Sequence, residues 1–112
     1  MPSLRLYSYW RSSAAYRVRL ALEYKGLPFD YLPVHLLRDG GEQFGADYLR
    51  VNPQSRVPAL EVGDVVLTQS MAILEWLDEA WPDTPRLLPG SALERARVRS
   101  LAQLIVADIQ PL

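Results

Sequence analysis

Apolar and polar residues alternate at the start of the chain, from Leu4 to Ser8, and this period of two predicts a β-strand. From about Ser13 to Lys25 the period becomes that of a helix, whose apolar face is formed by Ala14, Val18, Ala21 and Leu22. Gly26 is a typical helix stop, and Phe29 to Val34 predicts a second strand. Because a helix separates the two strands, we expect them to be parallel and joined by a right-handed crossover.

The middle of the chain predicts a short helix and a hairpin. After a loop at Arg38 to Gly41, the segment Phe44 to Leu49 predicts a short helix. Two apolar runs follow, Val57 to Val62 and Val65 to Leu67. The dipeptide Gly63-Asp64 between them is typical of a tight turn between antiparallel strands.

A third helix is predicted to begin at Ser70 and to end at Pro82. Its inner face comprises Ile73, Leu74, Leu77 and Trp81. The complete order β-α-β-α-β-β-α predicts an α/β protein of thioredoxin-like fold, with a mixed four-stranded sheet.

The end of the chain predicts a further helix after a proline-rich connector. Ser91 and Glu94 have the spacing of a capping box, and helical spacing of apolar residues continues through Leu101, Leu104, Ile105 and Ile109. This stripe could pack on the first domain, on another subunit or on helices outside this sequence, and we interpret the helix as the first of a second domain. The expected organisation is a thioredoxin-like domain at 1–82, a linker at 83–90 and the first helix of that second domain at 91–112.

The composition narrows the chemistry. The chain has 112 residues, a net charge of −1, one histidine and no cysteine. We therefore expect no nucleic-acid or membrane surface, no signal peptide, no disulfide and no Cys- or His-based metal site, in a cytoplasmic setting. Any sulfur chemistry must use a sulfur atom that arrives on a small molecule.

Three local motifs are candidates for ligand binding. Ser12-Ser13 lies at a strand-to-helix junction, where the hydroxyls either cap the helix or donate to a bound anion such as a thiolate. Arg17, one turn into the helix, would add positive potential. Val57-Pro58 is compatible with a trans proline that opens an edge strand, or with a cis proline whose preceding backbone pairs with a peptide-like ligand. Gln69-Ser70 combines a predicted N-cap with an amide suited to an α-amino acid group.

These motifs, in this order, resemble the N-terminal domain of glutathione transferases, and most closely the zeta class, the maleylacetoacetate isomerases. Members of that class carry Ser-Ser-Cys followed by an aromatic residue and Arg-Val-Arg-Ile-Ala-Leu, and the segment Ser12 to Leu22 is similar to it. Four further segments resemble the same class: 52–60, 69–77, 85–89 and 109–112.

The resemblance implies glutathione as cofactor. It also implies cis–trans isomerisation of maleylacetoacetate to fumarylacetoacetate, in tyrosine and phenylalanine breakdown, through a thiolate adduct. Ser12 and Ser13 are then the catalytic residues, Ser12 as the hydroxyl that activates the thiol. The implied glutathione-binding residues are Ser12, Ser13, Ala14, Ala15, Tyr16 and Arg17 around the cysteinyl part, Gln43, Val57 and Pro58 along the peptide backbone, Gln69 and Ser70 at the γ-glutamyl end, and Gln110 from the last helix.

The chain departs from the family at Ala14, where members commonly have cysteine. We expect activity to survive, with altered substrate handling or resistance to thiol modification. Family members also carry a whole helical domain, so this chain alone should bind glutathione weakly and isomerise poorly.

A maleyl-type diketo acid as substrate and a homodimer are implied. The alternatives are a maleylpyruvate isomerase, a general glutathione transferase, or a non-catalytic glutathione-binding or assembly module.

Overall fold

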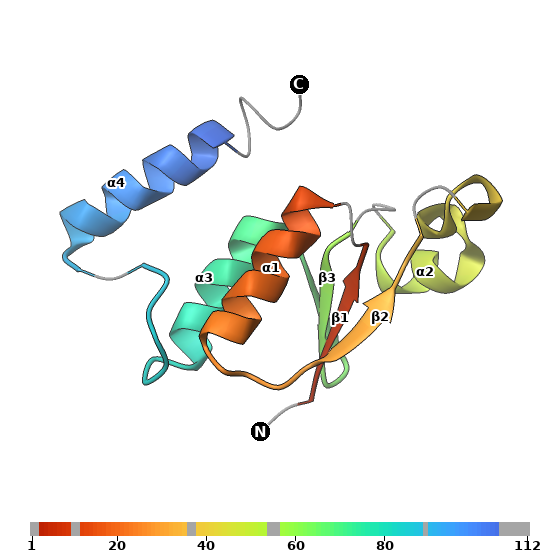
Figure 1. The fold of residues 1–112 in the computed structure, drawn as a ribbon, viewed down its shortest axis with the longest axis horizontal. Coiled ribbons are helices and arrows are strands. Elements are labelled where there is room, and N and C mark those ends of the chain that lie inside the picture. The colour runs from red at the N-terminus through yellow and green to blue at the C-terminus, as the bar shows by residue number, and fades with distance from the viewer. Residues whose placement is uncertain (1–2, 10–11, 36–37, 54–56, 89, 106–112) are drawn as a thin grey trace.

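Four strands form one mixed sheet in the computed structural model, which describes residues 3–9, 12–35, 38–53, 57–88 and 90–105 (Figure 1). The strands are β1 (Leu4–Ser8), β2 (Asp30–Pro33), β3 (Ala59–Val62) and β4 (Val65–Thr68), in the spatial order β2-β1-β3-β4. β1 and β2 are parallel, whereas β3 is antiparallel to both β1 and β4. The predicted thioredoxin-like α/β fold is confirmed.

The helices lie on both faces of this sheet. They are α1 (Ser13–Tyr24), α2 (Ala46–Val51), α3 (Ser70–Ala80) and α4 (Ala92–Gln103), and two 3-10 turns, Arg38–Gly40 and Glu42–Phe44, precede α2. α1 and α3 lie side by side on one face, and α2 covers the other (Figure 1). α4 lies farther out, and an apolar groove of about 540 Å³ separates it from α1 and α3.

Two clusters of buried side chains hold the sheet between these helices. The larger cluster joins β1 and β3 to α1 and α3 through Leu4, Leu6, Val18, Ala21, Leu22, Leu60, Ile73 and Leu77. The smaller one lies on the α2 face and comprises Val34, Tyr48 and Ala59. Because neighbouring strand residues point to opposite faces, Leu6 and Tyr7 contribute to different clusters. The centre of the sheet, at β1 and β3, is therefore covered on both faces, whereas β2 and β4 are more exposed.

Several predicted boundaries differ from the structure. The short helix starts at Ala46 rather than Phe44, because Glu42–Phe44 forms a 3-10 turn of its own. β3 starts at Ala59 rather than Val57, since Pro58 has no N–H to donate to a strand partner. On α1 it is Ala15, not Ala14, that joins Val18, Ala21 and Leu22 on the buried face.

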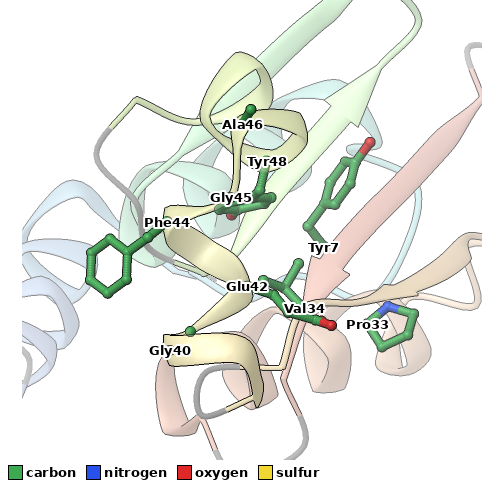
Figure 2. Close-up of a pocket in the computed structure, with 10 residues that line it drawn as sticks. Tyr7, Pro33, Val34, Gly40, Glu42, Phe44, Gly45, Ala46 and Tyr48 are labelled. Atoms are coloured by element: carbon green, nitrogen blue, oxygen red, sulfur yellow. The ribbon is translucent and has the colours of Figure 1, made fainter.

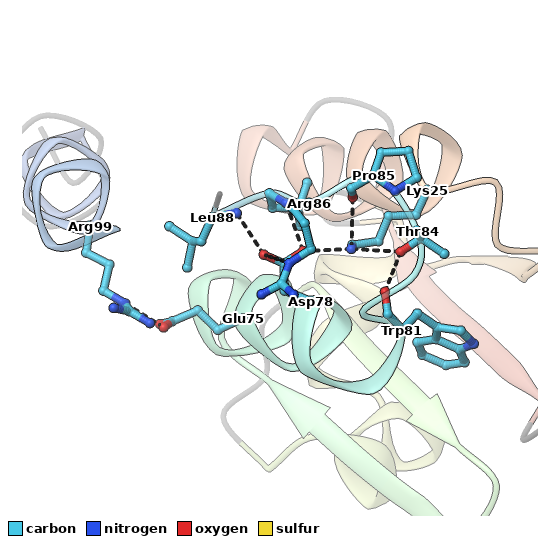
Figure 3. Close-up of polar contacts among 10 residues, drawn as sticks. Lys25, Glu75, Asp78, Trp81, Thr84, Pro85, Arg86, Leu88 and Arg99 are labelled. Carbon is cyan, nitrogen blue, oxygen red and sulfur yellow. Dashed lines mark hydrogen bonds and ion pairs between the residues drawn. The ribbon is translucent and has the colours of Figure 1, made fainter. Parts of the chain in front are cut away.

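A buried ion pair, missed by the sequence analysis, fastens the connector between α3 and α4 (Figure 3). Lys25, just after α1, places its ammonium 2.6 Å from the Asp78 carboxylate of α3 and donates to the Thr84 hydroxyl and the Pro85 carbonyl. Asp78 in turn accepts the backbone N–H groups of Leu87 and Leu88 at 2.8 and 2.7 Å. These contacts fix where the chain leaves the sheet domain and enters α4.

The start of α4 agrees with the prediction. Ser91 is its N-cap, and Ser91 and Glu94 form the predicted capping box. Leu101, Leu104 and Ile105 are exposed, and Ile109 lies outside the described residues. Among the described residues, none of the helices combines the length and the apolar character that spanning a membrane requires.

Candidate functional site

The strand register brings the three predicted motifs to one edge of the sheet. β1 runs from Leu4 to Ser8, and the chain then leads to Ser12. Tyr7 of β1 pairs with Ala59 of β3, so the preceding Pro58 lies beside the end of β1. Ala59 pairs in turn with Thr68 at the end of β4, from which Gln69 and Ser70 continue into α3. Residues distant in sequence therefore meet where α1 and α3 both begin.

Ser12 caps α1, as predicted. Its hydroxyl oxygen accepts the backbone N–H of Ala15 at 3.1 Å, and its carbonyl accepts the N–H of Tyr16 at 2.9 Å. A serine hydroxyl has one hydrogen to donate and two lone pairs with which to accept. Because the cap uses a lone pair, the Ser12 hydrogen remains available to donate to an anion at the positive end of the helix dipole.

The neighbouring residues of α1 have different environments. Ser13 and Tyr16 are exposed, Ala14 is half-buried and Ala15 is buried. The guanidinium of Arg19 lies 4.9 Å from the centre of the Tyr16 ring, and this contact turns Arg19 along the helix surface. Gln110, the last implied contact, lies outside the described residues.

The Val57–Pro58 bond is cis, so the trans alternative is excluded. Val57 is half-buried and packs against the small cluster under α2, while Pro58 is buried. The bond precedes β3 at the edge shared with Ser8 and Thr68. Val57 therefore lies at the end of the sheet where β1 ends and β3 begins, with its side chain on the α2 face.

The prediction that Ser70 is the N-cap of α3 is wrong. Gln69 is the capping residue, with a φ of 70° and no side-chain hydrogen bond to the helix start. Non-glycine residues seldom have a positive φ, and those that do are found disproportionately at functional sites. Ser70 is consequently the first residue inside α3, and its hydroxyl does not close the helix end.

Ser70 instead accepts a hydrogen bond from Arg17 of α1, over 3.2 Å. Only 6% of Ser70 is exposed, so this contact is sheltered from water. Burial lowers the pKa of Arg17, although a guanidinium stays charged at any ordinary pH. The pair connects the starts of α1 and α3 and places one positive charge between them. The sequence analysis placed Arg17 near the site but did not predict its partner.

Gln43 lies on the segment that follows β2. His35 and Glu42 close this segment with two hydrogen bonds: the His35 N–H donates to the Glu42 carboxylate at 2.7 Å, and the Glu42 N–H donates to the His35 carbonyl at 2.8 Å. The His35 ring accepts the Arg38 N–H through Nδ1 at 2.9 Å. Within the described residues, the buried Oε1 of Gln43 has no hydrogen-bond partner. This unpaired amide oxygen is suited to a ligand that donates an N–H.

A cavity of about 550 Å³ lies next to this segment (Figure 2). It is lined by Tyr7, Pro33 and Val34 of the sheet, by residues of the 40–46 segment and by Tyr48 of α2. The Tyr7 and Tyr48 rings pack 5.6 Å apart, and burial is the main reason that the pKa of Tyr48 is raised to about 12. Tyr48 therefore stays protonated and is no candidate for a general base near neutral pH.

The part of the chain that the structure describes contains no cluster of His, Asp or Glu side chains that could hold a metal. The starts of α1 and α3 provide two serine hydroxyls and one guanidinium. The unpaired Oε1 of Gln43 belongs to the separate segment that follows β2. Hydrogen-bond donors at helix starts stabilise anions. The starts of α1 and α3 are therefore suited to bind an anionic group.

Known proteins are similar to this chain in sequence and in fold. Residues 2–79 match the family model described as glutathione S-transferase, N-terminal domain. A probable maleylacetoacetate isomerase of Vibrio cholerae is 53% identical over 112 residues, which are all of this chain and 52% of that protein. The chain thus spans about half the length of such relatives.

Two solved structures agree with this relationship. The holo structure of a bacterial zeta-class maleylpyruvate isomerase has a TM-score of 0.89 and 48% identity, covering 96% of this chain and 49% of the other. A maleylacetoacetate isomerase from Anaeromyxobacter dehalogenans, with glutathione bound in its active site, has a TM-score of 0.82 and 52% identity. The match covers 99% of this chain and 53% of that isomerase.

Proposed function

From the premise that this chain belongs to the glutathione S-transferase N-terminal domain family, we propose that it forms the glutathione site of a zeta-class isomerase. The observation that carries the proposal is the meeting of Ser12, Val57–Pro58 and Gln69–Ser70 at one sheet edge, joined by the Arg17–Ser70 hydrogen bond. The solved relative with glutathione in its active site supports the choice of ligand.

The residues present fit this tripeptide. The unpaired Oε1 of Gln43 suits a peptide N–H, and the backbone of Val57 suits the cysteinyl part of the ligand. Gln69 and Ser70, at the start of α3, would bind the charged γ-glutamyl end. Ser13 and the residues from Ala14 to Arg17 would surround the thiol; Gln110 and Pro58 complete the proposed set.

Ser12 is the proposed thiol-activating group. Its hydroxyl donates to a thiolate while its oxygen caps α1, so the ligand sulfur lies at the positive end of the helix dipole. A free thiol has a pKa of about 8.5, and such surroundings lower it toward neutrality. This chain can therefore hold a thiolate without any cysteine of its own.

The proposed reaction is the isomerisation of maleylacetoacetate to fumarylacetoacetate. When bound, glutathione supplies the thiolate nucleophile that makes the cis double bond of the substrate temporarily single, so that rotation can occur. Ser12 keeps the sulfur ionised, and the fixed starts of α1 and α3 hold the ligand in one orientation. Maleylpyruvate is the second candidate substrate, because a maleylpyruvate isomerase matches the fold with a TM-score of 0.89.

Two assays test the proposal. Calorimetry on the full chain is expected to detect glutathione binding, and maleylacetoacetate or maleylpyruvate is expected to isomerise only when glutathione is present. Turnover of one substrate well above the other identifies the enzyme. Because the chain spans about half the length of its relatives, weak isomerisation by these 112 residues alone is expected. Binding without isomerisation of either substrate in a protein of the relatives' full length that contains this chain would favour the non-catalytic glutathione-binding module, and no binding would refute the proposal.

Three further parts of the proposal follow from the resemblance. They are a homodimer, a cytoplasmic location, and a division into a thioredoxin-like domain at 1–82, a linker at 83–90 and a helical segment at 91–112. The fastening of the connector by Lys25 and Asp78, and the start of α4 at Ala92, support that division. Sedimentation of the full chain tests the dimer.

A further inference from the structure

We propose that Arg17 is a positioning residue that sets the direction of the Ser70 hydroxyl, and thereby the selectivity of the site for a carboxylate at the γ-glutamyl end of the ligand. This inference rests on the proposed function. It gives Arg17, already in the proposed set, a second role in which its side chain acts on the ligand through Ser70 of a different helix.

The Ser70 hydroxyl does not cap its own helix. The hydroxyls of Ser12 and Ser91 each accept a backbone N–H at the start of their own helix, at 3.1 and 3.2 Å. Ser70 lies one position too far into α3 for that role, because Gln69 is the N-cap. Its oxygen accepts instead from the Arg17 side chain. The hydroxyl is therefore not committed to holding α3 together.

The direction of the hydroxyl hydrogen follows from the chemistry of its partner. A guanidinium carries only donors, so Arg17 must occupy a lone pair of the Ser70 oxygen. The Ser70 hydrogen cannot point at Arg17 and has to be donated elsewhere. Since 6% of Ser70 is exposed, few directions remain open to it. A neutral partner with an acceptor atom would allow the opposite arrangement, in which Ser70 donates to it.

The charges at this place favour an anion over a neutral or cationic group. Arg17 contributes a full positive charge in a half-buried position, where it is screened less than on the surface. The first N–H groups of α3 add the positive end of a helix dipole. A carboxylate therefore finds one directed O–H, backbone N–H groups and a nearby cation at the same point.

Calorimetry with three tripeptides on the full chain separates this role from a structural one. The ligands are glutathione, 4-aminobutyryl-cysteinylglycine, which lacks the α-carboxylate, and glutaryl-cysteinylglycine, which lacks the α-amino group. The wild-type chain is expected to bind the decarboxylated ligand roughly tenfold to a hundredfold more weakly than glutathione, the range of a lost hydrogen bond to a charged group. In Arg17→Met, the ratio of the affinity for glutathione to that for the decarboxylated ligand is expected to fall most of the way toward one. The ratio of the affinity for glutathione to that for the deaminated ligand is expected to stay as in the wild type.

Variants with matched changes complete the test. Arg17→Lys, which keeps a charged donor, is expected to restore much of the ratio. Arg19→Met removes an arginine of the same helix that lies over Tyr16, and is expected to leave the ratio as in the wild type. If Arg17→Met does not fold, Arg17→Gln takes its place, because it keeps a polar side chain without the charge.

Each result has one meaning. If the wild-type chain does not bind glutathione, the proposed function fails and the inference with it. If the wild type binds and discriminates, but the Arg17 variants lose affinity for all three tripeptides by the same factor, the function stands and the inference is overturned. An unchanged ratio in those variants overturns it as well.

Discussion

The Lys25 ammonium nitrogen lies 2.6 Å from Oδ1 of Asp78, and the two side chains are 0% and 3% exposed. The pair joins the end of α1 to the last turn of α3, and through Leu87 and Leu88 it holds the connector that leads to α4 (Figure 3). Arg86 contributes a weaker contact to the same carboxylate at 3.6 Å. A buried pair of this kind stabilises a fold only while both partners are present.

Asp78→Asn is therefore expected to lower the free energy of unfolding by about 3–5 kcal/mol, because it leaves the Lys25 charge buried and unpaired. Glu75→Gln is the matched control: Glu75 lies on the same helix and pairs with Arg99 at 2.8 Å, but these side chains are 34% and 40% exposed. Its expected cost is about 0–1 kcal/mol. Urea unfolding of the full chain measures both. Similar costs for the two variants would contradict the assigned role of Asp78.

The same carboxylate gives the stability a pH dependence. Burial by itself raises the pKa of Asp78, but the Leu87 N–H, the Lys25 side chain and the Leu88 N–H together bring it below its usual value of 3.8. The unfolded chain then binds the proton more readily, so the contribution is complete above about pH 5 and is lost as the pH falls below about 4. The free energy of unfolding, measured between about pH 3 and 7, is expected to fall less steeply in Asp78→Asn than in the wild type. Parallel curves would exclude this origin.

The regular elements could be predicted because their causes are local. The alternation in β1, the helical period of α1 and the turn at Gly63-Asp64 each depend on residues a few positions apart. The order of these elements was enough to predict the mixed sheet. The three motifs could also be found, since serines at helix starts and a proline before a strand have local signatures.

Contacts between distant residues could not be predicted in this way. Lys25 follows the C-terminal end of a helix, a place where an exposed cation is favourable. Nothing near it in the sequence therefore indicated that its side chain is buried. Asp78 lies four residues after Leu74 and three before Trp81, both on the predicted inner face, and this spacing was the available indication of a buried carboxylate. For Ser70, the preference of serine for the N-cap was misleading because Gln69 adopts the left-handed conformation. Its true partner, Arg17, is 53 positions away.

Ser70→Ala is expected to affect ligand binding more than stability, because Gln69 and not Ser70 is the N-cap of α3. Because the Ser70 hydroxyl closes no helix end, the substitution is expected to lower the free energy of unfolding by less than about 1 kcal/mol. Glutathione affinity is expected to fall about tenfold or more, through loss of a hydrogen bond to a charged group. Ser100→Ala, an exposed serine in α4, is the control for the same chemical change and should alter neither quantity. Unchanged affinity for Ser70→Ala, measured by calorimetry, would remove Ser70 from the ligand site.

Ser12→Ala separates the two roles assigned to the hydroxyl at the start of α1. Loss of the bond from the Ala15 N–H is expected to cost about 1 kcal/mol of stability. Loss of the donor to sulfur is expected to raise the pKa of bound glutathione by about one to two units, which corresponds to one charge-assisted hydrogen bond, and to lower turnover. The thiolate absorbance of the complex, followed against pH, measures this change.

Ser91→Ala is the control for Ser12→Ala, because it removes a cap of the same kind at the start of α4, where no residue of the proposed set lies. It is expected to reduce stability by a similar amount and to leave the thiol pKa unaltered. If Ser12→Ala shows the stability loss alone, with the same titration of the thiol as the wild type, Ser12 is only a cap. In that case the dipole of α1 and the backbone N–H groups at its start would have to hold the thiolate without a hydroxyl.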